Sequence, residues 1–228
     1  MHPQYKLAIF DLDGTLIDSK LDLAHSVNAT RAHMSLAPLE HETIYSYVGN
    51  GAPVLMRRSM GAAMPQHDVD LALRFFLGYY RDHCLDFTAL YPGVRDALNA
   101  LKSGGVSMAI LTNKPVKVSK LIVDGLGLGD HFFQIYGGNS FEQKKPDPVG
   151  IHALLSESGV PAEQTLMIGD SGVDIQTARN ANVRAVGCTW GFQPEALITN
   201  PPDWLIENML ELPAIVGVPT APSADAII

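Results

Sequence analysis

Two carboxylates stand one residue apart near the start of the chain. Asp11 and Asp13 directly follow an apolar run over residues 7–10, which is typical of a strand buried on both faces. Carboxylates this close repel each other and should not both stay ionised without a compensating positive charge. A divalent cation such as Mg²⁺, which prefers oxygen ligands, would remove the conflict. For this stretch alone, a turn that leads through Asp18 and Ser19 into a capped helix is the structural alternative.

Three later segments carry polar residues that fit the same chemistry. Two of them, residues 112–114 and 169–174, follow apolar runs, and the third, residues 144–148, leads into a predicted helix. Each segment alone is compatible with an ordinary loop. Four such segments, each at a predicted strand end or helix start, favour a single functional site instead.

The residue types in these segments are those needed for phosphoryl transfer. Four carboxylates beside a phosphate would concentrate negative charge, so the site needs Mg²⁺ and a fixed cation, for which Lys145 is the natural candidate. Thr112 offers a hydroxyl, and neighbouring backbone N–H groups can hold phosphate oxygens. The chain has no Walker-type phosphate loop and no candidate serine–histidine pair, which favours a carboxylate as the nucleophile.

The elements that must position these residues follow from the apolar patterns. After residue 93, strand patterns alternate with helix patterns, which predicts an α/β fold with a Rossmann-like parallel sheet and helices on both faces. In such sheets the binding site lies beyond the carboxyl ends of the strands. The predicted strands cover residues 7–10, 106–111, 133–136, 165–168, 183–188 and 204–206. The predicted helices between them cover residues 94–102, 116–126, 148–158, 173–181 and 195–199.

A helical segment separates the first strand from the others. Apolar residues recur at helical spacing through residues 19–87, and no strand pattern is present there. We therefore predict an all-helical cap inserted into the catalytic core. The predicted boundaries are residues 1–16 and 88–218 for the core, 17–87 for the cap, and 219–228 for a loose tail.

The composition is that of a globular protein. The 228 residues are 46% hydrophobic and 18% charged, which provides ample material for a core. The formal net charge of −8 argues against non-specific nucleic-acid binding. Two distant cysteines do not indicate a zinc ribbon or a disulfide framework, and no signal peptide or membrane-spanning pattern is present. We expect a cytoplasmic protein that binds neither nucleic acid nor membrane.

The four motifs, in this order, resemble those of the haloacid dehalogenase superfamily, in its phosphatase branch. Within that superfamily the chain is most similar to the phosphoglycolate phosphatase group, over most of its length up to about residue 218. The four motifs are residues 11–15, 111–113, 145–146 and 169–174. The similarity to the phosphoglycolate phosphatase group is supported by residues 48–51, 91–94 and 189–192.

The resemblance implies roles for the acidic residues. Asp11 would attack phosphorus and form an aspartyl-phosphate, and Asp13 would protonate the leaving alcohol and then activate water. The Asp11 carboxylate, the Asp13 backbone carbonyl and the Asp170 carboxylate would bind Mg²⁺. Asp174 would support the metal, either directly or through water or Lys145.

The resemblance also implies a binding site for a small phosphorylated metabolite, in a monomer or a homodimer. Thr112 and the Asn113 amide would hold the phosphate, and Lys145 would neutralise both the phosphate and the nucleophile. The cap would close over the site and exclude water. The substrate-facing turn of the cap would consist of Gly49, Asn50 and Gly51.

Four residues leave the substrate and some roles open. Asn139 stands where relatives often carry aspartate, and Asn182 stands where they often carry glycine. Asp147 stands where relatives often carry a neutral residue or histidine. Arg57 in the cap is either a partner for a substrate carboxylate or a solvated surface arginine.

Other reactions of the same superfamily are partly excluded. Asp13 argues against dehalogenase chemistry, which lacks the second aspartate of the first motif. Lys20 is the single cap lysine and lies at the edge of the cap, which argues against a Schiff base formed there. Hydrolysis of a sugar phosphate or of pyrophosphate is the main alternative function. A phosphomutase and a non-catalytic binding module are weaker alternatives.

Overall fold

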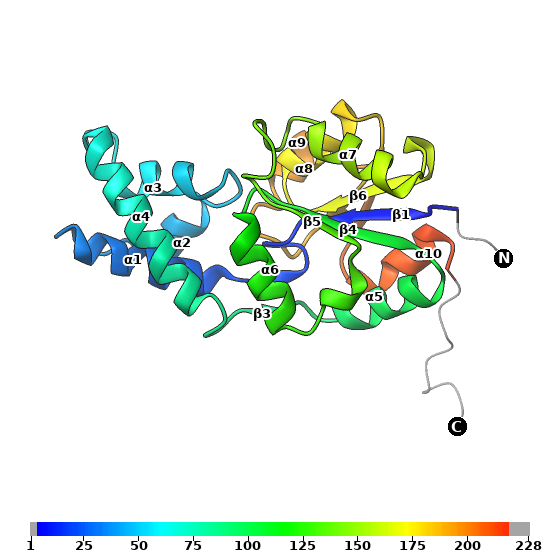
Figure 1. Cartoon of the computed structure of the whole chain (residues 1–228), viewed down its shortest axis with the longest axis horizontal. Coiled ribbons are helices and arrows are strands. Elements are labelled where there is room, and N and C mark those ends of the chain that lie inside the picture. The colour runs from blue at the N-terminus through cyan, green and yellow to red at the C-terminus, as the bar shows by residue number, and fades with distance from the viewer. Residues whose placement is uncertain (1–3, 219–228) are drawn as a thin grey trace, which may run out of the picture.

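A six-stranded parallel sheet forms the centre of the protein (Figure 1). The computed structural model describes residues 4–218, so the predicted tail over residues 219–228 lies outside the described residues. The strand order is β5-β4-β1-β6-β7-β8. These strands are β1 (Leu7–Phe10), β4 (Ser107–Leu111), β5 (Gln134–Tyr136), β6 (Thr165–Gly169), β7 (Arg184–Cys188) and β8 (Trp204–Ile206).

The central strand β1 fixes which loops meet at the edge of the sheet. All four of its residues are buried, as its unbroken apolar sequence predicts. Phe10 lies opposite Ile110 on one neighbouring strand and opposite Ile168 on the other. The carboxyl ends of the three strands are therefore level, so the polar residues that follow each strand lie side by side.

Helices cover both faces of the sheet because successive strand residues point to opposite sides. Ala8 and Phe10 pack into one apolar cluster with residues of α5, α6 and α10, whereas Leu7 and Ile9 pack into a second cluster with residues of α7, α8 and α9. The helices on the first face are α5 (Val94–Ser103), α6 (Val116–Gly125) and α10 (Leu212–Val216). Those on the second face are α7 (Val149–Ser158), α8 (Gly172–Asn180) and α9 (Ala196–Thr199).

Four helices lie to one side of the sheet (Figure 1). They are α1 (Lys20–His33), α2 (His41–Tyr45), α3 (Ala52–Met60) and α4 (Gln66–His83). A short antiparallel ribbon, β2 (Ile17–Asp18) with β3 (Ala89–Leu90), connects them to the sheet. The predicted fold class, a Rossmann-like core with an inserted helical cap, is confirmed. The domain boundaries stay a prediction.

The elements that were not predicted are short. The strands β2 and β3 have two residues each, too few to show an alternating pattern. Helix α10 has five residues and was also not predicted. The 3-10 helices are η1 (Gly129–His131), η2 (Ala162–Gln164) and η3 (Met209–Glu211). Among the described residues, no helix combines the length and the apolar character needed to cross a membrane.

Candidate active site

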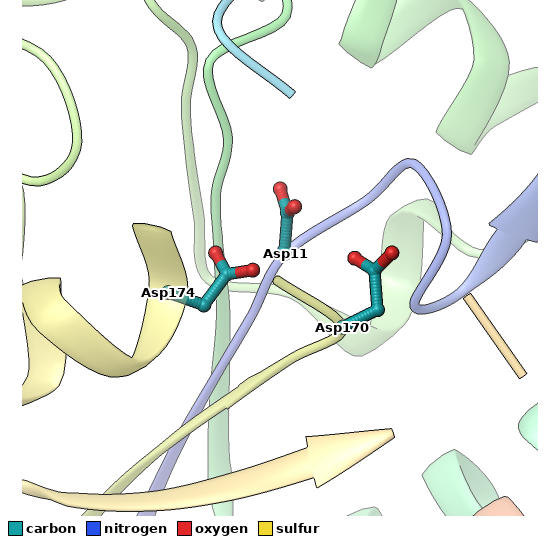
Figure 2. Close-up of side chains that lie close together, drawn as sticks. All are labelled: Asp11, Asp170 and Asp174. Carbon is teal, nitrogen blue, oxygen red and sulfur yellow. The ribbon is translucent and has the colours of Figure 1, made fainter. Parts of the chain in front are cut away.

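Three carboxylates from distant parts of the sequence meet at the carboxyl end of the sheet (Figure 2). Asp11 follows β1, Asp170 follows β6, and Asp174 belongs to the first turn of α8. One oxygen from each side chain lies within 4.8 Å of the others. The structure therefore brings together three of the four residues predicted to bind metal.

Two glycines allow Asp170 to fit into this cluster. The Asp170 carboxylate accepts a hydrogen bond from the Phe192 N–H at 2.7 Å and one from the Thr15 hydroxyl at 3.3 Å. A Cβ atom added to Gly14 would lie 2.3 Å from Asp170 Oδ2, and one added to Gly191 would lie 2.1 Å from Asp170 Cβ. Gly14 also has a φ of +81°, which side-chain-bearing residues rarely adopt.

Lys145 forms an ion pair with two members of the acidic cluster. Its ammonium lies 2.6 Å from Asp174 Oδ1 and 2.9 Å from Asp11 Oδ1. The other oxygen of Asp174 accepts hydrogen bonds from the Ser171 N–H and hydroxyl, in a capping box that begins α8. Asp174 is fully buried and does not line the cavity described below, so it orients Lys145 rather than facing a substrate.

The acidic cluster is electrostatically unfavourable when no cation is bound. Burial, and to a smaller extent the Asp174 carboxylate, raise the pKa of Asp11 to about 6, against the opposing effect of Lys145. Burial raises the pKa of Asp170 to about 8, with Asp174 and Asp11 adding to the shift. Burial also lowers the pKa of Lys145, but its two carboxylate partners outweigh that effect and keep the pKa above its ordinary value.

A divalent metal fits this cluster. Three of the four carboxylates predicted for the site pair with the two ammonium groups of Lys145 and Lys114, and Asp170 pairs with neither. When all four carboxylates are ionised, two negative charges are left without a compensating cation. Asp11 Oδ1 is buried and accepts no aligned hydrogen bond from any described residue, although Lys145 lies close to it. A buried carboxylate oxygen without a donor is a suitable ligand for a hard cation.

We expect Mg²⁺ to stabilise the protein more at high pH than at low pH. The pKa values of Asp11 and Asp170 are higher in the folded protein than in the unfolded chain. The metal-free fold therefore loses stability as pH rises from about 4 to about 8, because both groups must then ionise inside the protein. Mg²⁺ binds the ionised carboxylates and should offset that loss. The increase in Tm with MgCl₂ over EDTA should be larger at about pH 8 than at about pH 5. Equal increases at both pH values would contradict a metal bound by these groups.

Asp13 is held by two residues whose roles were not predicted. The Lys114 ammonium lies 2.8 and 3.0 Å from its two carboxylate oxygens, and the Ser19 hydroxyl donates to Oδ1. Ser19 is one of the two residues, with Asp18, whose type suits an N-cap of the next helix. It occupies the N-cap position of α1, but its side chain makes no capping bond because the hydroxyl faces Asp13 instead.

The predicted phosphate-binding residues lie beside this acidic cluster. Thr112 and Asn113 both line the cavity directly after β4. The side-chain amide of Asn113 donates to the Lys145 carbonyl and to the Gly49 carbonyl, each at 3.1 Å. Its N–H₂ group therefore connects the core to the cap.

The cap turn is held by donors from three separate core loops. Gln193 donates to the Val48 carbonyl at 2.8 Å, and Lys144 donates to the Asn50 carbonyl at 2.6 Å. Together with the bond from Asn113 to the Gly49 carbonyl, the main-chain carbonyls of three successive residues, 48–50, accept hydrogen bonds from the core. Of the predicted turn residues, Gly49 and Gly51 line the cavity, and Asn50 does not.

The cavity between cap and core has a polar floor and an apolar roof. Asp11, Asp13, Asp170 and Thr112 line the floor. The roof is lined by the cap residues Leu23, Val48, Ala52, Leu55, Phe76 and Leu77.

Arg57 does not belong to the cavity lining. Its guanidinium donates to the Met64 carbonyl at 2.7 Å and to the Gln66 side chain, so it bonds to residues at and before the start of α4. In this structure Arg57 has a local role within the cap.

Comparison with known proteins identifies the family. Residues 8–188 match the family model of haloacid dehalogenase-like hydrolases. The chain belongs to this family. The resemblance inferred from its four motifs is therefore confirmed, and the acidic cluster lies at the carboxyl end of the sheet of this hydrolase.

Similar proteins extend the match over nearly the whole chain. A phosphoglycolate phosphatase of Pseudomonas fluorescens is 38% identical over 98% of this chain and 88% of its own length. One of Colwellia psychrerythraea is 38% identical over 91% of this chain and 95% of its own length. A crystal structure described as a "predicted phosphoglycolate phosphatase" from Haemophilus somnus has a TM-score of 0.89 and 33% identity, covering 93% of this chain and 98% of that one.

Proposed function

We propose that this hydrolase is a Mg²⁺-dependent phosphatase that cleaves 2-phosphoglycolate into glycolate and phosphate. The observation that carries the proposal is the position of Asp11. It lines the cavity together with Asp170 and Asp13, and the Lys145 ammonium lies 2.9 Å from one oxygen of its carboxylate. Relatives named phosphoglycolate phosphatase, at 38% identity, support the choice of substrate.

The metal would be held by Asp11, the Asp13 backbone carbonyl and Asp170, with Asp174 behind them. When bound, Mg²⁺ supplies positive charge that neutralises phosphate oxygens and the clustered carboxylates. Lys145 supplies a second, permanent positive charge from the protein itself. These charges lower the electrostatic barrier to bringing a phosphate dianion to an anionic nucleophile.

The chemistry then requires two steps at two aspartates. An Asp11 oxygen forms a bond to phosphorus while the bond from phosphorus to the ester oxygen breaks, and Asp13 donates its proton to that oxygen. In the second step water attacks phosphorus, Asp13 takes a proton from that water, and the bond between Asp11 and phosphorus breaks. Ser19 and Lys114 keep the Asp13 carboxylate in place for both proton transfers.

The substrate class is tested by comparing phosphate esters. Phosphate release from 2-phosphoglycolate, several sugar phosphates and pyrophosphate would be measured with MgCl₂ and, as a control, with EDTA. We expect 2-phosphoglycolate to give the highest kcat/KM and EDTA to abolish release. A higher kcat/KM for a sugar phosphate or pyrophosphate would refute the substrate while leaving the phosphatase activity intact. A cytoplasmic location and a monomeric or dimeric state stay predictions.

A further inference from the structure

One buried cation borders the cavity and has no role in the predicted motifs. Lys114 directly follows Thr112 and Asn113, and among the described residues that line the cavity it is the only lysine, arginine or histidine. The other buried lysine of the site, Lys145, does not line the cavity and is already paired with Asp11 and Asp174. Lys114 is therefore the positive group that a substrate beyond the phosphate would meet.

The ammonium of Lys114 is held from both the core and the cap. It contacts both oxygens of Asp13 from the core, and it donates to the Tyr80 hydroxyl of cap helix α4 at 2.6 Å. It also lies 4.5 Å from the centre of the Tyr80 ring. The three N–H donors of the ammonium are taken up by the two Asp13 oxygens and the Tyr80 hydroxyl. A substrate carboxylate would therefore replace one of the two bonds to Asp13, which keeps the other.

The position of Asp13 fixes where a substrate carboxylate would lie. To protonate the leaving group, Asp13 must contact the ester oxygen. In 2-phosphoglycolate the carboxylate carbon is only two bonds from that oxygen. A cation in direct contact with Asp13 is therefore next to the position of the substrate carboxylate.

We propose that Lys114 is a specificity-determining residue that binds a carboxylate on the leaving group of the substrate. The site would accordingly prefer phosphate esters with a carboxylate one carbon from the ester oxygen, an inference that rests on the proposed phosphatase function. Tyr80 is the positioning residue through which the cap holds the ammonium at this point.

The roof of the cavity favours this small anionic leaving group over a sugar. Leu23, Leu55 and Phe76 offer no hydrogen-bond partners, so sugar hydroxyl groups that face this apolar part of the wall would be buried without partners. The polar lining residues of the cap side are few, and the hydroxyl of one of them, Tyr80, already accepts from Lys114. A two-carbon leaving group needs one polar contact beyond the ester oxygen. Lys114 provides that contact, with a charge of the matching sign.

The kinetic test compares two esters of the same shape. The kcat/KM values for 2-phosphoglycolate and for its neutral carboxamide would be measured for the wild type and for Lys114→Met. We expect the wild type to prefer the carboxylate by about a hundredfold and Lys114→Met to lose most of that preference. The ratio between the two esters cancels any common loss from disturbing Asp13. Lys117→Met, on the exposed side of α6, removes the same charge and should keep the wild-type ratio.

A binding measurement keeps the test valid if the variant turns over slowly. Calorimetry with Mg²⁺ present would compare 3-phosphonopropionate, which cannot be hydrolysed, with propylphosphonate, which lacks the carboxylate. The wild type should bind the first at least about tenfold more tightly, and Lys114→Met should bind both alike. Lys114→Arg should restore part of the preference. Tyr80→Phe, which keeps the ring but not the hydroxyl, should raise KM for 2-phosphoglycolate more than for the carboxamide.

The outcomes separate this inference from the proposed function. If Lys114→Met loses activity equally toward both esters and keeps the binding preference, the proposed role of Lys114 is overturned and the phosphatase function stands. If the wild type releases no phosphate from 2-phosphoglycolate but does so from other esters, the proposed substrate fails. A wild type that hydrolyses both esters equally well would overturn carboxylate recognition itself.

Discussion

Asp11→Asn should lower kcat for phosphate release by at least about a thousandfold, which corresponds to about 4 kcal/mol in the activation barrier. The amide has the same shape as the carboxylate but cannot form a bond to phosphorus as an anionic nucleophile. Wild-type enzyme, quenched with acid during turnover of labelled substrate, should carry a protein-bound phosphate that hydroxylamine removes. Asp11→Asn should carry none, and label retained in that variant would rule out Asp11 as the nucleophile.

The same variant should not lose stability. Because burial raises the pKa of Asp11 to about 6, its ionised form is unfavourable in the metal-free fold at about pH 8. Replacing it with a neutral amide should leave Tm in EDTA unchanged or higher at that pH. Asp18→Asn is the matched control, because Asp18 is exposed and lies outside the cavity lining. It should keep full activity.

Lys145→Met should lose both activity and stability. The lysine is 5% exposed and is the cation that separates Asp11 from Asp174. Removing one partner of a buried ion pair costs roughly 3–5 kcal/mol, or about 10 °C in Tm for a protein of this size. We expect kcat to fall by at least about a hundredfold because a fixed positive charge at the phosphate is lost. Urea unfolding and steady-state kinetics would measure the two effects.

The loss of stability in Lys145→Met should depend on pH. Without the ammonium, the pKa values of the two carboxylates rise further, so the penalty is present at high pH and shrinks as they become protonated toward about pH 5. Lys144→Met removes the same charge one residue earlier. Its ammonium donates to the Asn50 carbonyl, and losing that bond should cost only about 1 kcal/mol. If both variants lost a similar amount of free energy of unfolding, the buried ion pair of Lys145 would not be the cause of the instability.

The sheet and the acidic cluster could be predicted because both depend on local patterns. The apolar run at residues 7–10 indicates a strand buried on both faces, and the parallel arrangement brings the carboxyl ends of such strands together. Asp11 and Asp170 directly follow two neighbouring strands. Their proximity thus follows from strand order, even though they are far apart in the sequence.

The residues around Asp13 could not be predicted in the same way. Tyr80 fits the helical spacing of α4 and is buried, so its pattern is that of an ordinary core residue. Its contact with Lys114 depends on how the cap sits on the core, which no local pattern encodes. For Lys114 the only signal was its position directly after Thr112 and Asn113 at the end of a strand.

The three departures from the family pattern have local explanations. Asn139 Oδ1 accepts a hydrogen bond from the N–H of Val116 at the start of α6, a role that an aspartate oxygen could also fill. Asp147 Oδ1 accepts one from the Val149 N–H at the start of α7. Asn182 has a φ of +55°, a conformation that glycine adopts freely and asparagine tolerates better than most residues. None of these residues lines the cavity.

The bonds that hold the cap turn have a consequence for how the protein can diversify. Gln193, Asn113 and Lys144 all donate to main-chain carbonyls, which every amino acid provides. Replacing the side chain of Val48 or Asn50 therefore leaves these acceptors in place. Over evolution or in a mutant library, the side chains of the turn could therefore change while the hydrogen bonds that attach the cap to the core are kept.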